Sequence, residues 1–249
     1  MIELKNFSKT YSSKKARRSG NSVFSIDDLS MVVENGSITG LLGVNGSGKT
    51  TILKAICGFH FPTSGTITID GINTENSPEK IMELVGYVPE IPQLPVNMTV
   101  YDFLKYAGET HGLSGDKLAE SIKNVTKECS LEKFLSKKIK TLSKGQQQRV
   151  SFAQAIIHNP PNLVLDEPIS GLDPAQIIQM RDLIKKLSKN KAILMSTHIL
   201  QEVYSLCSKM YVMNNGQIAG EGTEEEIVKA TSSKDLEEAF LKLSKKEEE

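Results

Sequence analysis

The sequence predicts an α/β protein with a mainly parallel β-sheet. Short strand-like runs alternate with helical patterns along most of the chain, which is the order that parallel strands and their connecting helices produce. Segments 37–42 and 162–165 are the clearest buried strands. The 249 residues, of which 39% are hydrophobic and 24% charged, suffice for one large domain or for a domain with an inserted lobe.

Composition excludes several classes of protein. Thirty lysines and arginines balance thirty aspartates and glutamates, so no whole-molecule field attracts nucleic acid, and we expect no nucleic-acid partner. The three cysteines, Cys57, Cys129 and Cys207, lie far apart and predict neither a zinc site nor a disulfide framework. No apolar run approaches the roughly 20 residues of a membrane span, and the N-terminus lacks a signal-peptide pattern, so we expect an intracellular protein that crosses no bilayer.

Two segments predict antiparallel pairing. Segment 66–70 alternates apolar and polar residues and ends in an Asp-Gly turn, which is typical of a strand with one solvated face. Segment 211–218 behaves similarly around Asn215 and Gly216.

The middle of the chain predicts an inserted helical lobe. Residues 90–95 are punctuated by proline, Thr99 is a suitable helix N-cap, and mostly helical segments follow to about residue 157. The tail 231–249 carries apolar residues at helical spacing and is expected to form a short amphipathic helix. The basic cluster 14–18 most simply indicates a solvated hairpin tip, with contact to lipid head groups as the alternative.

A phosphate-binding loop is indicated between the first buried strand and a helix. Residues 43–50 read GVNGSGKT, which matches Gly-x-x-x-x-Gly-Lys-Thr in the strand, loop and helix context that the motif requires. Lys49 would lie along the β- and γ-phosphates, and Thr50 would offer its hydroxyl to Mg²⁺. An ordinary glycine-rich turn is the disfavoured alternative. The predicted nucleotide-binding residues here are Gly43, Val44, Asn45, Gly46, Ser47, Gly48, Lys49, Thr50 and Thr51.

Two carboxylates follow the second buried strand. Asp166 and Glu167 lie in NLVLDEP, at the edge where a parallel sheet presents its ligand crevice. Asp166 suits the coordination shell of a metal, and Glu167 is placed to accept a proton from an attacking water. A strand that ends in a charged turn is the alternative, which the upstream phosphate loop disfavours.

The motifs, taken in order, resemble those of ATP-binding cassette (ABC) proteins. LSKGQQQR at 142–149 resembles the Leu-Ser-Gly-Gly-Gln signature of this family, about twenty residues before the acidic strand. A Q-loop at Glu90, a D-loop at 170–173 and the switch histidine His198 complete the series. The resemblance spans about 2–230, which we expect to form one nucleotide-binding domain. It implies a P-loop NTPase (RecA-like) core with a mainly parallel sheet, an N-terminal antiparallel β subdomain, and a helical subdomain inserted at about 90–157.

The resemblance also implies a site shared by two chains. Two cassettes would pack head to tail, and each ATP would lie between the phosphate loop of one and the signature of the other. Ser143, Gly145 and Gln146 would contact that ATP. A helix beginning there is compatible with this role because its positive end can face a γ-phosphate. Ser143 and Gln146 also suit a helix cap, and both roles are compatible.

Three further residues take their expected roles from the resemblance. Tyr11 would stack on adenine through its flat face. His198 would contact the γ-phosphate and help to orient the water. Asp173 would communicate across the dimer, and it also suits the N-cap of a helix that begins at Pro174 and ends at Ser188.

Two positions depart from the family pattern. Glu90 stands where glutamine is frequent, and its carboxylate can still bind Mg²⁺ or hold the water, with more negative charge. Lys144, at the third signature position, partly offsets that charge in the opposed half-site. This combination is similar to ATPase subunits of multicomponent exporters of the antibiotic, multidrug and sodium type.

The apolar segment 91–104 is expected to contact a membrane partner. The resemblance implies that this region forms a groove that receives a coupling helix from the transmembrane permease subunit. Ile91, Leu94 and Val96 are the contact candidates. The segment also holds three residues that we expect to form the buried stripe of a helix, namely Val100, Phe103 and Leu104.

These observations predict the ATPase subunit of an ABC transporter, cytoplasmic and bound to the inner face of the membrane through a permease. It would hydrolyse ATP with Mg²⁺ and power transport, and the resemblance implies export as the direction. The expected catalytic residues are Glu167, His198, Lys49 and Glu90, and the expected metal ligands are Thr50, Asp166 and Glu90. A soluble ABC-type ATPase that acts as a nucleotide-driven switch without a membrane partner is the alternative.

Overall fold

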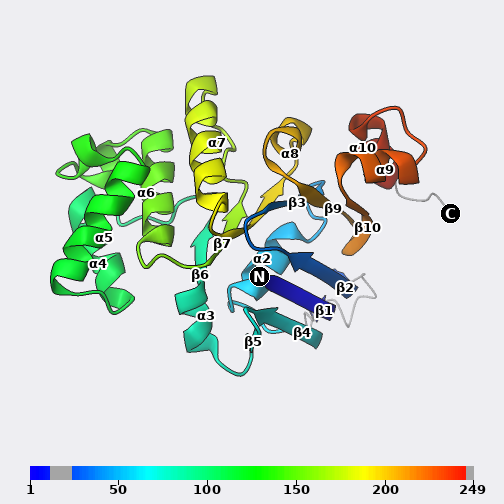
Figure 1. Cartoon of the computed structure of the whole chain (residues 1–249), viewed down its shortest axis with the longest axis horizontal. Coiled ribbons are helices and arrows are strands. Elements are labelled where there is room, and N and C mark those ends of the chain that lie inside the picture. The colour runs from blue at the N-terminus through cyan, green and yellow to red at the C-terminus, as the bar shows by residue number, and fades with distance from the viewer. Residues whose placement is uncertain (12–23, 245–249) are drawn as a thin grey trace, which may run out of the picture.

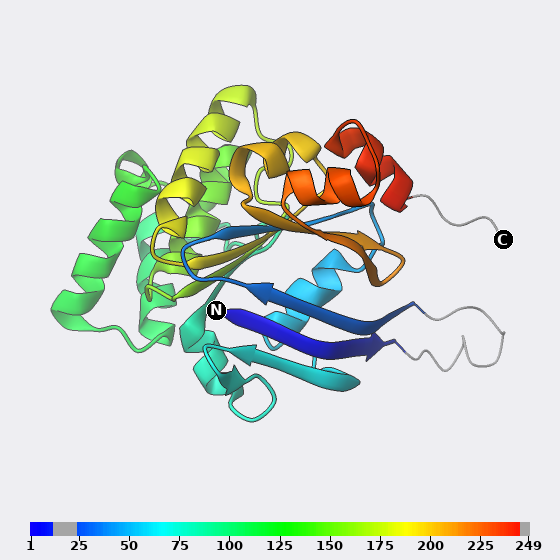
Figure 2. The same cartoon turned by 45° about the vertical axis from the view of Figure 1, so that its right-hand side comes forward.

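Two β-sheets with helices between and around them make up the computed structural model, which describes residues 1–11 and 24–244 (Figures 1 and 2). The smaller sheet is antiparallel, with the order β2-β1-β4-β5. Its strands are β1 Ile2–Thr10, β2 Ser25–Val33, β4 Ser64–Ile69 and β5 Ile72–Asn73. The basic cluster 14–18 lies outside the described residues.

The larger sheet has six strands in the order β10-β9-β3-β8-β7-β6. All neighbouring strands are parallel except β9 and β10, which form a hairpin. The predicted mixture of a mainly parallel sheet and an N-terminal antiparallel sheet is confirmed. The strands are β3 Ile38–Gly43, β6 Val85–Val88, β7 Asn162–Asp166, β8 Ala192–Thr197, β9 Lys209–Asn214 and β10 Gln217–Gly222.

The two expected turns have the backbone that tight hairpins require. Asp70 and Gly71, between β4 and β5, have φ angles of 49° and 80°. Asn215 and Gly216, between β9 and β10, have φ angles of 46° and 82°. Two successive residues in the left-handed region match the right-handed twist of the flanking strands, which explains the choice of Asp-Gly and Asn-Gly.

Helices cover both faces of the larger sheet. Helix α2, Lys49–Ile56, lies between the two sheets and packs its apolar residues into the core that they share (Figure 2). The opposite face is covered by α7 Pro174–Ser188 and α8 Leu200–Leu206. Helix α3, Pro78–Leu84, packs at the β6 edge of the larger sheet. At the opposite edge, α9 Glu224–Ala230 and α10 Leu236–Ser244 pack on β9 and β10.

Three helices pack together at one side of the molecule: α4 Val100–Thr110, α5 Gly115–Glu128 and α6 Lys144–Ile156 (Figure 1). Thr99 caps α4, since its Oγ1 accepts a hydrogen bond from the Asp102 N–H at 3.1 Å. The residues expected to form the buried stripe of this helix are buried as predicted: Val100, Phe103 and Leu104.

Polar contacts fix the two sheets relative to each other. The buried Asn162, at the start of β7, donates from Nδ2 to Asp70 Oδ2 at 2.8 Å and to the Leu84 carbonyl at 3.1 Å. On the other side, the Tyr211 hydroxyl accepts a hydrogen bond from the Val32 N–H at 3.0 Å. Within the described residues, no helix is long and apolar enough to span a bilayer.

Candidate functional site

The phosphate loop joins β3 to α2. Gly48 is the N-cap of α2 with φ 111°, a conformation that glycine adopts without strain. At the loop's start, a Cβ on Gly43 would lie 2.6 Å from Ser47 Oγ and 2.7 Å from the Met213 carbonyl, so no side chain fits there. The two glycines therefore allow the loop to close tightly in front of a helix N-terminus.

Three features of this loop fit a phosphate group. The Lys49 ammonium is buried and donates to the Gly43 and Val44 carbonyls at 2.6 and 3.2 Å. Burial lowers the pKa of Lys49, and the charges of Glu167, Asp166 and Glu90 oppose that shift. Ser47 Oγ is buried and has no hydrogen-bond partner among the described residues. An orphaned hydroxyl, an ammonium and free helix N–H groups together make an anion site.

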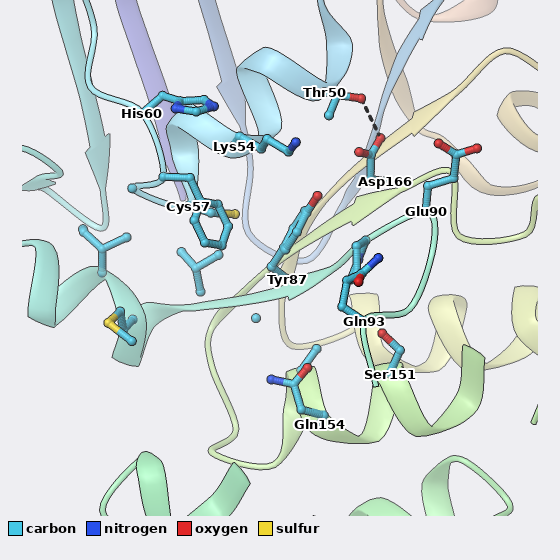
Figure 3. Close-up of a pocket in the computed structure, with 18 of the residues that line it drawn as sticks. Thr50, Lys54, Cys57, His60, Tyr87, Glu90, Gln93, Ser151, Gln154 and Asp166 are labelled. Atoms are coloured by element: carbon cyan, nitrogen blue, oxygen red, sulfur yellow. Dashed lines mark hydrogen bonds between the residues drawn. The ribbon is translucent and has the colours of Figure 1, made fainter. Parts of the chain in front are cut away.

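Asp166 ends β7 and faces the start of α2. The Thr50 hydroxyl lies 3.4 Å from Asp166 Oδ1 (Figure 3). Ser196, at the neighbouring position of β8, donates to the same carboxylate at 2.7 Å and accepts a hydrogen bond from the Glu167 N–H at 3.0 Å. One carboxylate and one hydroxyl fit Mg²⁺, which takes its remaining oxygen ligands from phosphates and water. No group of three or more His, Cys, Asp or Glu in the described ranges forms a metal cage.

Glu167 and His198 form a close pair. His198 Nδ1 lies 2.8 Å from Glu167 Oε2, and the carboxylate is buried whereas the imidazole is half exposed. Lys49 Nζ lies 3.9 Å from the other carboxylate oxygen. A buried carboxylate beside an imidazole and an ammonium can accept a proton from a water held between them.

These residues surround a cavity of about 640 Å³. It is lined by the predicted residues Asn45, Gly46, Gly48, Lys49, Thr50, Thr51, Glu90, Glu167 and His198. Phe24 also lines it, whereas Tyr11 does not. The Tyr11 ring instead meets His60 edge-on, with ring centroids 6.0 Å apart.

The predicted signature and D-loop residues form a second group, which does not line this cavity. Ser143 and Gln146 make a capping box at the start of α6, as expected: Ser143 Oγ accepts from the Gln146 N–H at 3.3 Å, and Gln146 Oε1 accepts from the Ser143 N–H at 3.0 Å. Gln176 packs over Gly145, so a Cβ there would displace the Gln176 side-chain amide. Asp173 caps α7, as expected, by accepting from the Gln176 N–H at 3.0 Å.

A second cavity of about 970 Å³ adjoins the first. We call it the groove; its walls come from α2 and the residues after it, α3, β6, the start of the Q-loop and α6 (Figure 3). Ile91 and Leu94 line it, and Val96 does not, although Val96 is exposed. Thr50 and Glu90 line both cavities.

Sequence reasoning missed three residues near the site. Ser196 bridges Asp166 and Glu167. The only sequence signal for its role was its position two residues before His198. Phe24 lines the cavity. An aromatic residue close to the predicted hairpin tip was the sequence signal that could have suggested this. Tyr87 points its hydroxyl at Asp166 (Figure 3). Burial, and secondarily the charge of the Asp166 carboxylate, raise the pKa of Tyr87, so the hydroxyl stays protonated.

The fold and the site together define a phosphate-loop nucleotide hydrolase. A family model described as "ABC transporter" matches residues 26–170. The chain is 32% identical over 243 residues to the ABC transporter ATP-binding protein NatA of Bacillus subtilis (strain 168), which covers 97% of each chain. It is 33% identical over 216 residues to the Nod factor export ATP-binding protein I of Cupriavidus metallidurans, covering 86% of this chain and 71% of that protein.

Solved structures agree. An ATP-binding subunit of an ABC transporter superposes with a TM-score of 0.86 at 30% identity, covering 98% of this chain and 100% of the other. The dimeric structure of MJ0796, a bacterial ABC transporter cassette, superposes with a TM-score of 0.78 at 26% identity, covering 90% of this chain and 98% of the other. The protein belongs to the ABC transporter family as an ATP-binding subunit, an ATPase that powers transport through a membrane partner.

Proposed function

We propose that Glu167 is the general base of ATP hydrolysis in this chain. The observation that carries the proposal is the Glu167–His198 contact of 2.8 Å beside the phosphate loop. Glu167 accepts the proton of the attacking water, and His198 holds that water and the γ-phosphate in place. Lys49 neutralises charge that develops on the phosphate oxygens, which is why its ammonium is fixed within the loop.

We further propose that the chain binds ATP together with Mg²⁺. Thr50 and Asp166 would hold the ion, and Glu90 lies with them on the wall of the groove. When bound, Mg²⁺ supplies charge neutralisation for the β- and γ-phosphates. Phe24 and Tyr11 are the two aromatic residues near this end of the chain that can offer a face to adenine.

Replacing Glu167 tests the assignment of the base. Glu167→Gln keeps the size and shape of the side chain but cannot take up a proton at neutral pH. We expect the kcat for ATP to fall by at least about 100-fold, the usual contribution of a general base, while ATP binding is retained. Phosphate release and equilibrium binding of ATP measure the two effects.

A matched control is Glu225→Gln, an exposed residue in the first turn of α9. It should hydrolyse ATP at the wild-type rate. If Glu167→Gln also hydrolyses ATP at that rate, then Glu167 is not the base.

We propose that two cassettes close around each ATP, with a second copy or a similar chain as partner. Ser143 is exposed, and it lies with Gly145 and Gln146 outside the cavity that holds the phosphate loop, at the N-terminus of α6. This helix end can therefore face a nucleotide bound to another cassette. The dimer seen for MJ0796 supports this arrangement. The Glu167→Gln protein should therefore sediment as a dimer when ATP is added.

We propose that the groove receives a segment of a transmembrane permease, which holds the cassette at the cytoplasmic face of the membrane. Its rim carries exposed apolar side chains, among them Phe59, Met82 and Ile91. The similarity to a Nod factor export protein supports export as the direction of transport.

Charge in the groove tests the proposed docking. Ile91→Asp places a carboxylate on the apolar rim, and we expect at least a ten-fold loss of tagged protein from washed membranes of the native cells. Leu241→Asp on α10 is the matched control, because Leu241 has similar exposure, 61% against 68%, but does not line the groove. Equal membrane retention of the two variants would exclude docking at Ile91.

A further inference from the structure

Tyr87 lies where the groove and the metal-binding residues meet. It belongs to β6 and pairs in register with Val164 of β7, two residues before Asp166. Alternate residues of a strand share a face, so Val164 and Asp166 point to the side of the sheet on which Tyr87 packs. The long tyrosine side chain leans along the strand and brings its hydroxyl toward the Asp166 carboxylate (Figure 3).

The other contacts of Asp166 leave a place for this donor. Thr50 and Ser196 both approach Oδ1, at 3.4 and 2.7 Å. A carboxylate has about four lone-pair sites, so three hydroxyl groups and a metal ion cannot all use one oxygen, but two oxygens accommodate them. A hydroxyl that approaches from the groove side would limit rotation of the carboxylate about χ2.

We propose that Tyr87 is a positioning residue, whose hydroxyl donates to the Asp166 carboxylate and fixes the orientation in which Asp166 binds Mg²⁺. The inference rests on the proposed role of Asp166 as a metal ligand. It extends that role to a side chain that also forms the wall of the groove.

The same ring connects Asp166 with the groove surface. Phe59 follows α2 and contacts Tyr87 in an edge arrangement, with ring centroids 5.7 Å apart and planes at 64°. Phe59 is 62% exposed and lines the groove. A segment that occupies the groove would touch both Phe59 and the Tyr87 ring, and the proposed hydrogen bond would extend this series of contacts to Asp166.

Removing the hydroxyl alone tests the proposal. Tyr87→Phe retains the ring and its contact with Phe59, so packing is preserved. We expect the Mg²⁺ concentration that gives half-maximal ATPase activity to rise about ten-fold, the size of one hydrogen bond to a charged acceptor. At saturating Mg²⁺ the KM for ATP should stay within about two-fold of wild type, because the other phosphate contacts remain.

Tyr106→Phe is the matched control, since Tyr106 is exposed on α4 and lines neither cavity. It should leave the Mg²⁺ requirement unchanged. A wild-type Mg²⁺ requirement in Tyr87→Phe would overturn the positioning role of Tyr87. Absence of ATPase activity in the wild-type protein would instead refute the proposed function, so the two failures are distinguishable.

A spectroscopic measurement tests the link to the groove. The sequence contains no tryptophan, so Phe59→Trp introduces a single tryptophan beside Tyr87, whose emission can be excited apart from that of the tyrosines. Adding Mg²⁺ to the ATP-saturated Phe59→Trp protein should shift its emission, and the additional change Tyr87→Phe should abolish that shift. An emission that ignores Mg²⁺, or a shift that survives Tyr87→Phe, would contradict the proposed series of contacts.

Discussion

Glu167 combines a strained backbone with the site's central contact. Its φ of 46° lies in the left-handed region, which costs a residue with a side chain about 1–3 kcal/mol. Hydrogen bonds hold the residue there: Ser196 Oγ accepts from its N–H at 3.0 Å, and its carbonyl accepts from the Ser170 N–H at 3.1 Å. These two hydrogen bonds therefore hold the strained backbone in the conformation in which the carboxylate contacts His198.

His158 gives the protein a pH-dependent stability. Its ring stacks on His111, with centroids 3.7 Å apart and planes at 7°. Burial lowers the pKa of His158 from 6.5 to about 4, and the charges of His111 and Lys191 add to this shift. Glu83 faces His111 and acts against the burial that lowers the pKa of His111.

We therefore expect the folded protein to lose stability as the pH falls from 6.5 toward about 4. The unfolded chain takes up a proton near pH 6.5, whereas the folded chain resists it, so the stabilisation is complete only above that pH. Allowing for the part of the ring that water screens, the free energy of unfolding should drop by about 1–2 kcal/mol at about pH 5 relative to pH 7.5. Urea unfolding at the two pH values measures it.

His158→Gln removes the titrating group and should lose most of that drop, whereas His60→Gln, at a histidine outside the stack, should keep it. If the free energy of unfolding of wild type and His158→Gln depends on pH in the same way, the burial of His158 is not the cause.

At the scale of single elements, α6 and α9 begin with the same capping box. Thr223 and Glu226 repeat at α9 the reciprocal bonds that Ser143 and Gln146 make at α6, with distances of 3.3 and 2.8 Å. The same N-terminal capping arrangement therefore occurs in two helices of this chain. Only the α6 box lies within the predicted signature.

We expect Ser143→Ala and Thr223→Ala each to lower the free energy of unfolding by about 1 kcal/mol, because each removes one cap. Only Ser143→Ala should also lower kcat/KM for ATP, by about ten-fold, since its hydroxyl is proposed to contact a nucleotide across the dimer. Urea unfolding and steady-state ATPase assays separate the effects. Equal activity of the two variants would leave Ser143 a helix cap alone.

Elements with strong local signals could be predicted from the sequence. The Asp173 cap and Pro174 define the start of α7, and Asn215-Gly216 defines a hairpin, because these signals act through the backbone of adjacent residues. Strand β3 begins and ends one residue later than segment 37–42. Strand ends depend on partners in other segments, so the sequence locates them less well.

At the scale of the whole molecule, contacts between distant segments could not be predicted. Tyr87 reaches Asp166 only because β6 and β7 are neighbours in a particular register. Asn162 joins β7 to the turn after β4, across 92 positions of sequence. Motif spacing and the family resemblance predicted the phosphate loop, Asp166, Glu167 and His198 as site residues, but they carry no information on side chains that support them from neighbouring strands.

The two cavities share Thr50 and Glu90 in their walls, and this sharing has a thermodynamic consequence. Two ligands that share side chains on one protein have a coupling free energy, and that coupling is reciprocal. If bound nucleotide changes the affinity of the groove for its occupant by some factor, the bound occupant changes the affinity for nucleotide by the same factor. With a permease segment as the proposed occupant, ATP would act on the permease and the permease would act on ATP by the same factor.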